Sequence, residues 1–178
     1  IRLSLVGSEM CIRDRVTTLS DSVRWQGVDS AEWQHFDVTY TVAYNALRLR
    51  IAGTGYVEFD DVVATEYTGE TTSNQKQLLV DGDMEASGTG DWSSISSATL
   101  SKESGAAEDG SQYLKITNTS GSTNNISAYQ GILSVGKTYR VTGWARSDGT
   151  HVPDAFLGSS GASKWGRGTT STNWQRVD

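Results

Sequence analysis

Hydrophobic and polar residues alternate along several short segments of the chain. In residues 46–52, ALRLRIA, three large apolar side chains alternate with Arg48 and Arg50. A period of two is that of a β-strand with one buried face, so both arginines are expected on the polar side. The same pattern, rich in β-branched and aromatic residues, predicts strands at 35–42, 56–66, 98–102, 112–117, 126–133, 137–147 and from 174 to the end.

Glycine, serine and asparagine separate these segments, and no long segment has helical periodicity. Turns at 53–55 and 81–83 and a polar loop at 118–125 divide the chain into short strands. The turn at 134–136 predicts that the strands on either side of it form a hairpin. This density of strands and turns is typical of an antiparallel β-sandwich.

The end of the chain repeats a pattern from near its start. Trp165 and Trp174, the second followed by QRVD, resemble Trp25 and Trp33, the second followed by QHFD. The second tryptophans lie 174 − 33 = 141 residues apart, which is the length of a β-domain and too long for a solenoid repeat. The sequence therefore predicts two truncated copies of one module.

A polar segment at 68–77, TGETTSNQKQ, predicts a linker between the copies. On this interpretation 16–67 is the C-terminal half of a first module and 78–178 is the N-terminal part of a second. Residues 1–15, IRLSLVGSEMCIRDR, do not continue the β pattern. They resemble a translated sequencing-adaptor artefact of environmental gene predictions and are left out of the fold prediction, the alternative being a genuine short helix.

Composition narrows the classes of partner. The formal net charge is −6, with 15 Lys and Arg against 21 Asp and Glu. This balance argues against binding of nucleic acid or of anionic membranes, because both need clustered cations. The single cysteine, Cys11, leaves no intrachain disulfide. Six tryptophans against three phenylalanines favour large core anchors or flat surfaces for stacking.

Three sequence pieces carry a family resemblance when 78–178 is joined to 38–66. They are VDGDME at 80–85, GKTYRVTGWARS at 136–147 and VEFDDVVATE at 57–66. Their order resembles carbohydrate-binding modules of families 4, 9 and 22, within the galactose-binding-like jelly rolls. The resemblance implies an all-β antiparallel jelly-roll β-sandwich that binds glycans without cleaving them, usually appended to a secreted glycoside hydrolase.

The resemblance also predicts how the two incomplete copies fit together. The first and last strands of such jelly rolls generally lie side by side, and a module without its last strands exposes a sheet edge. We hypothesise that 39–66 fills this gap, so that circularly permuted halves close one sandwich with 16–37 left over as a duplicated edge. Absence of contact between 39–66 and 78–178 would contradict this hypothesis.

The segment 137–147 carries the candidate glycan site. Its alternation places Arg140, Trp144 and Arg146 on one face, where a sugar ring could stack on the indole and its hydroxyl groups could bond to polar side chains. Tyr129 and Gln130 are expected to flank Trp144 across the predicted hairpin. The alternative is that Trp144 packs under a loop and that the arginines are merely solvated.

The other tryptophans are given structural roles. Trp92, in a Gly-Asp-Trp turn, is expected to anchor the core. Trp33 and its repeat Trp174 begin strands and are interpreted as structural. Trp25 is placed in a loop, where it either binds ligand or packs at an edge.

Acidic residues suggest a cation. The resemblance implies a structural calcium near the junction of the first and last strands, with Glu85, Asp60 and Asp61 at the matching positions. Carboxylates and backbone carbonyls are the oxygen ligands that calcium prefers. The alternative is that the aspartates of DGD shape a turn and that Asp60 and Asp61 cap a strand end.

The sequence offers no catalytic constellation. It has no Ser-His-Asp context, no glycine-rich phosphate loop and no CxxC, and His35 and His151 are not in metal-ligand spacing. We therefore expect a non-catalytic, extracellular or cell-surface module. It would dock a polysaccharide or oligosaccharide for a glycoside hydrolase or other domain of its parent chain. The alternative function is a structural or adhesive sandwich repeat of a surface or virion protein that binds no glycan.

Overall fold

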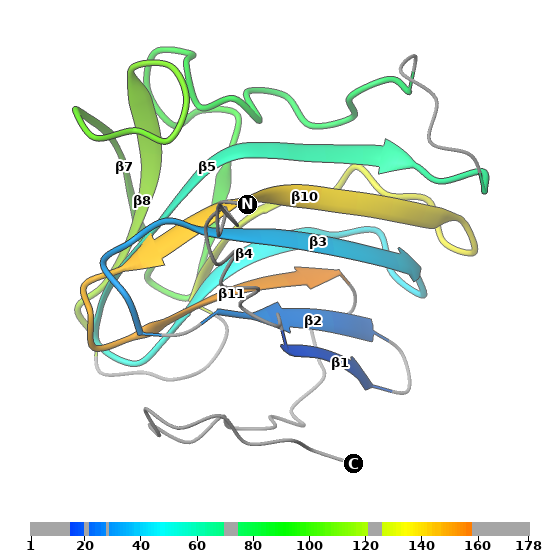
Figure 1. Ribbon diagram of the computed structural model, residues 1–178, viewed down its shortest axis with the longest axis horizontal. Helices are drawn as coiled ribbons and strands as arrows, with labels where there is room; N and C mark the ends of the chain where they lie inside the picture. Colours follow the sequence, from blue (N-terminus) through cyan, green and yellow to red (C-terminus); the bar gives the residue numbers. More distant parts are fainter. Residues whose placement is uncertain (1–14, 20–21, 28, 70–74, 121–125, 158–178) are drawn as a thin grey trace, which may run out of the picture.

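The computed structural model describes residues 15–157, except for 20–21, 28, 70–74 and 121–125. Within these ranges the chain contains no helix, and hence none long and apolar enough to cross a membrane. Eleven strands in the described ranges form two antiparallel sheets whose inner faces enclose one core (Figure 1). The protein is therefore an all-β sandwich, as the alternation predicted, and the jelly-roll assignment stays a prediction.

One sheet has six strands and the other has five. The order in the first is β1 (Arg15–Leu19), β2 (Ser22–Gln26), β11 (Val152–Leu157), β4 (Leu47–Ala52), β9 (Ser127–Gln130) and β6 (Ser93–Ile95). The order in the second is β3 (Gln34–Thr41), β10 (Thr138–Ser147), β5 (Gly55–Glu66), β8 (Gln112–Asn118) and β7 (Thr99–Ser104).

The segments on either side of 68–77 share both sheets. β5 pairs with β10 and β8, and β4 pairs with β9 and β11. Figure 1 shows β3 and β5 on either side of β10. The contact that the permutation hypothesis requires of 39–66 is present. The origin of the chain in two tandem copies stays a prediction, as does the linker.

The strands described within 16–37 lie at the edges of the two sheets. β1 and β2 end the six-stranded sheet, and β3, which begins at Gln34, ends the five-stranded sheet. Trp25 belongs to β2, so its placement in a loop is wrong. The expected leader up to residue 14, Trp165, and the strand predicted from Trp174 lie outside the described residues.

The core is built from the alternating positions. Leu47, Leu49 and Ile51 of β4 are buried in it, together with Trp92, as predicted. Phe36 of β3 and Phe59 of β5 meet edge to face, with ring centroids 6.4 Å apart.

Two expectations for the chain near β4 and β9 are wrong. Arg48 and Arg50 are not exposed: only 4% and 3% of their surfaces are accessible, and burial lowers the pKa of Arg48. The hairpin at 134–136 does not form, because β9 and β10 belong to different sheets. The chain turns there but crosses between the layers, and Leu133 and Gly136 donate backbone hydrogen bonds to Asn45 and Val42.

Candidate functional site

The outer face of the five-stranded sheet carries aromatic and charged side chains from neighbouring strands. In β10 every second residue is buried, so Arg140, Trp144 and Arg146 lie on the outer side, as the alternation predicted. These side chains stand on the second strand of the sheet, between β3 and β5. The sheet thus places them on a rigid support.

A β-bulge positions Trp144. The pairing of β10 with β5 shifts between Thr142 and Trp144, so that Asp61 and Val62 together oppose Gly143. Asp61 adopts a φ of 43°, as the additional residue of a bulge often does. Gly143 is required here because a Cβ would lie 2.7 Å from the Phe36 ring and 3.1 Å from the Val62 Cα.

Trp144 is half-buried beside His35. The two rings meet edge to face, with centroids 4.9 Å apart and an interplanar angle of 68°. His35 is exposed on β3, directly opposite Trp144 in the register, and Asp60 is opposite it on β5. The Trp144 indole and the His35 imidazole therefore meet on the face, and the buried Asp60 is their neighbour in the register.

Arg140 is paired and not merely solvated. Its Nε and Nη2 donate to the two carboxylate oxygens of Asp37, at 2.9 and 2.6 Å. These contacts raise the pKa of Arg140. The planar guanidinium is therefore fixed in orientation at the surface of the sheet.

Arg146 lies beside two aromatic rings that contact each other edge to face. Its Cζ is 4.2 Å from the centroid of Trp33 and 4.9 Å from that of Tyr113. Its Nε donates to Glu58 at 2.5 Å, and Lys115 approaches the other carboxylate oxygen of Glu58 at 3.8 Å. Arg146 is thus held by stacking and by a charged hydrogen bond.

Trp33 contributes to the same face although its sequence pattern suggested a structural role. The indole Nε1 donates to the carbonyl of Ala106, in the loop between β7 and β8, at 3.0 Å, and the ring centroid lies 5.8 Å from that of Tyr113 on β8. Together with the Arg146 contact, this hydrogen bond holds the Trp33 ring over the outer face of the sheet. The ring remains half-buried.

Tyr129 and Gln130 are not part of this face. They belong to β9 in the six-stranded sheet, where Tyr129 lies 6.0 Å from the Arg48 guanidinium. The buried Gln130 amide donates to the Val80 carbonyl at 2.7 Å and accepts from the Val80 N–H at 3.1 Å. The sequence prediction failed for these two residues because it rested on the hairpin.

His35, Tyr113 and Glu58 also belong to the face, although the sequence did not single them out. The alternation within 35–42, 112–117 and 56–66 indicated which side chains share one side of each strand. It contained no signal that β3 and β5 pair with β10 or that β8 pairs with β5, because these pairings join residues far apart in the chain.

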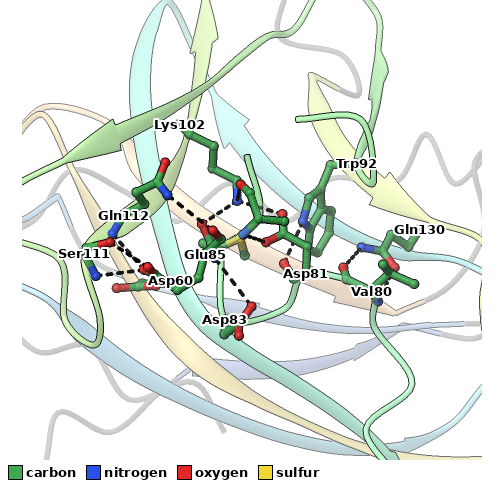
Figure 2. Close-up of polar contacts among 12 residues, drawn as sticks. Asp60, Val80, Asp81, Asp83, Glu85, Trp92, Lys102, Ser111, Gln112 and Gln130 are labelled. Atoms are coloured by element: carbon green, nitrogen blue, oxygen red, sulfur yellow. Dashed lines mark hydrogen bonds and ion pairs between the residues drawn. The ribbon is translucent and has the colours of Figure 1, made fainter. Parts of the chain in front are cut away.

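Two of the three acidic residues expected to bind calcium, Glu85 and Asp60, accept hydrogen bonds instead. Figure 2 shows the bonds that Glu85 accepts. Glu85 accepts hydrogen bonds from the N–H groups of Ser111 and Gln112, both at 2.8 Å, and from the Ser111 hydroxyl at 2.6 Å. These bonds lower the pKa of Glu85. The carboxylate therefore holds the end of the loop between β7 and β8.

Asp60 holds the same loop from the other side. It accepts hydrogen bonds from the N–H groups of Glu108, Asp109 and Asp61 at 2.8, 3.1 and 2.9 Å. Its side chain is fully buried, and burial raises its pKa to about 6 although the three hydrogen bonds act to lower it. Burial, followed by the neighbouring Asp109 and Asp83, also raises the pKa of Asp61.

These contacts do not fit a calcium ligand set. The oxygens of Glu85 and Asp60 point at N–H and O–H groups, which a cation would have to displace. Across the described part of the chain, no group of three or more His, Cys, Asp or Glu side chains could hold a metal ion. Close by, Lys102 reaches the turn at 81–86 and pairs with Asp81 (Figure 2).

In comparisons with protein-family models, with curated proteins and with solved structures, the chain gives no match. The family resemblance thus depends on the three sequence pieces at 57–66, 80–85 and 136–147. A β-sandwich supports many functions, so any function must be argued from the outer face itself.

Proposed function

We propose that the outer face of the five-stranded sheet binds a polysaccharide or oligosaccharide without cleaving it. The observation that carries the proposal is the contact of the half-buried Trp144 with the exposed His35, on the same face as the Arg140–Asp37 pair. The apolar face of a pyranose ring stacks on an indole, while its hydroxyl groups bond to charged and polar side chains at the rim.

The order of these side chains before binding supports the proposal. Two hydrogen bonds to Asp37 fix Arg140, while contacts with the Trp33 and Tyr113 rings and a hydrogen bond to Glu58 fix Arg146. A ligand that meets side chains already held in place loses less conformational entropy on binding. A rigid face of this kind suits a polymer that presents one sugar after another.

The wider role follows from the family resemblance. Such a module would keep a glycan close to a catalytic or repeat domain of its parent chain, in an extracellular or cell-surface protein. The glycosidic bond would be cleaved elsewhere, by a glycoside hydrolase domain.

A second candidate is a structural repeat without a glycan site. The observation that favours it is the pairing of both arginines of the face with carboxylates, Arg140 with Asp37 and Arg146 with Glu58. Cross-strand pairs of opposite charge stabilise a sheet whether or not a ligand binds.

The test is calorimetric titration of the full chain with soluble xylan, mixed-linkage β-glucan and mannan. We expect one of them to bind and the Trp144→Ala variant to bind it at least about tenfold more weakly, a loss of ~1.4 kcal/mol. The physical reason is that truncation removes the stacking surface and leaves the polar rim intact.

Tyr44→Ala is the matched control, because Tyr44 is an exposed aromatic residue in the loop after β3. It should bind like the unmodified chain. A chain that unfolds cooperatively but binds no glycan, or a Trp144→Ala variant with unchanged affinity, would contradict the proposal and favour the structural repeat.

A further inference from the structure

A buried lysine fills the centre of the turn formed by residues 81–86, DGDMEA (the DGDMEA turn). Lys102 reaches it from β7, and its Nζ lies 2.7 Å from Asp81 Oδ2 and 2.5 Å from the Met84 carbonyl oxygen. The Ala86 carbonyl oxygen is 3.5 Å away. Only 4% of the Lys102 side chain and 1% of the Asp81 side chain are exposed.

The backbone of the turn is shaped around this ammonium group. Asp81 and Met84 adopt φ angles of 52° and 59°, in the left-handed region that residues other than glycine seldom enter. The second oxygen of Asp81 accepts from the Ala86 N–H at 2.8 Å and closes the turn. Backbone carbonyls and a carboxylate consequently converge on one point.

Neighbouring elements hold the turn from outside. The Asp81 carbonyl accepts from the indole of Trp92 at 3.2 Å, and the Gly82 carbonyl accepts from the Val62 N–H of β5 at 2.7 Å. Glu85 is bonded to Ser111 and Gln112. The convergent oxygens are therefore fixed independently of the expected calcium ligands.

We propose that the Lys102 ammonium is the resident cation of the DGDMEA turn, in the place that a metal ion would otherwise take. One carboxylate and two carbonyls are the hard oxygen ligands of Na⁺ and Ca²⁺, and an ammonium group has three donors to offer them. Its single positive charge balances the Asp81 carboxylate. While Lys102 is in place, charge and space exclude a metal, so folding requires none. This proposal does not depend on glycan binding.

Loss of the ammonium leaves a buried anion and two carbonyls aimed at an empty position. Removing one partner of a buried ion pair is strongly destabilising, and for a chain of this size we expect the Tm of Lys102→Ala to fall by roughly 6–20 °C. The vacated position then has the ligands for a small cation. The variant should bind a metal that the unmodified chain does not bind.

The experiment compares thermal unfolding of the full chain in EDTA, in choline chloride, in sodium chloride and in calcium chloride. The calcium concentration is about 5 mM, which exceeds the largest dissociation constants of extracellular calcium-binding modules. We expect the Tm of the unmodified chain to be the same in EDTA and in calcium. For Lys102→Ala, calcium or sodium should recover several degrees of the lost Tm, because a ligand that binds only the folded state raises its stability.

Two further variants serve as controls. Asp81→Asn combined with Lys102→Ala removes the carboxylate and should lose the response to metal. Lys115→Ala removes a partly exposed lysine of the same sheet, which is paired with Glu58 at 3.8 Å. It should lower the Tm only slightly and gain no response to metal.

Either of two results would overturn the proposal. One is an unmodified chain whose Tm falls in EDTA or rises in calcium, which would show that a metal is bound while Lys102 is present. The other is a folded Lys102→Ala variant that no cation stabilises. If Lys102→Ala does not fold, Lys102→Gln retains donors for the carbonyls and takes its place in the same comparison.

Discussion

At the scale of single residues, the partner opposite a side chain decides its role. Asp60 and Glu85 have the residue type and the sequence positions that suggested calcium ligands. In the folded chain both carboxylates accept backbone N–H groups of the loop between β7 and β8. The sequence indicated the strand of Asp60 and the turn before Glu85, but the donors come from a loop more than 20 residues away in the chain.

Asp60 should make stability depend on pH. Its pKa of about 6 in the folded chain lies above the ordinary value of 3.8 because the side chain is buried. The folded state therefore binds this proton more tightly than the unfolded state. The stabilisation is complete below about pH 4 and is lost as the pH rises through 6, by up to about 3 kcal/mol.

Urea unfolding of the unmodified chain and of Asp60→Asn between pH 4 and 8 tests this dependence. As the pH rises, the unmodified chain should lose unfolding free energy relative to Asp60→Asn. Asp148→Asn is a control of opposite sign. Burial acts to raise the pKa of Asp148, but hydrogen bonds from Thr150, His151 and Tyr56 lower it overall, so its carboxylate stabilises the fold above pH 4. If the difference in unfolding free energy between the unmodified chain and Asp60→Asn does not change with pH, the prediction is wrong.

At the scale of elements, the strands were predictable and their neighbours were not. β3, β4, β5, β7, β8 and β10 lie where the alternation placed them, within two residues at each end. The hairpin at 134–136 was wrong because a turn sequence fixes a local reversal of the chain and not the sheet that the next strand joins. The DGDMEA turn illustrates the same point, since its contacts with β5, β7 and Trp92 are all tertiary.

Gly82→Ala should destabilise the fold by about 1–3 kcal/mol, because the added methyl group has no room. An ideal Cβ at this position would lie 2.2 Å from the Val62 carbonyl oxygen of β5 and 2.7 Å from the amide nitrogen of Gln77. The turn would have to move away from β5 and lose the hydrogen bond from the Val62 N–H to the Gly82 carbonyl. Chemical denaturation measures the loss.

Gly131→Ala is the control for Gly82→Ala. No atom lies within 4 Å of an ideal Cβ at Gly131, and its φ is outside the left-handed region. Its stability should stay within about 0.5 kcal/mol of the unmodified chain. Equal effects of the two substitutions would show that the close approach of the turn to β5 is not what requires glycine.

At the scale of the whole molecule, two stretches of chain build one sandwich. Strands from before 68–77 alternate with strands from after it in the five-stranded sheet, where β10 lies between β3 and β5. The inner faces of both sheets contain residues from each stretch, such as Phe36 and Leu114 in the core. Neither stretch contains a complete sheet.

The fragments 16–67 and 78–178 should therefore fail to unfold cooperatively when produced alone. Each would lack strands on which its own strands depend, and unpaired edges and half a core remain exposed. Mixed together, the fragments should recover the tryptophan fluorescence and the single unfolding transition of the full chain. The full chain is the control, and a cooperative transition of 78–178 alone would contradict the prediction.

The sequence by itself determined the all-β class, most strand positions and the side of each strand that faces the core. These properties depend on a period of two between near neighbours, and such local patterns are written in the chain. Only the tertiary structure decided that Trp144 lies beside His35, that Tyr129 and Gln130 lie in the other sheet, and that Lys102 occupies the DGDMEA turn. Those facts depend on strand pairing between distant segments, and on burial that leaves Lys102 and Asp81 each other's charge partner.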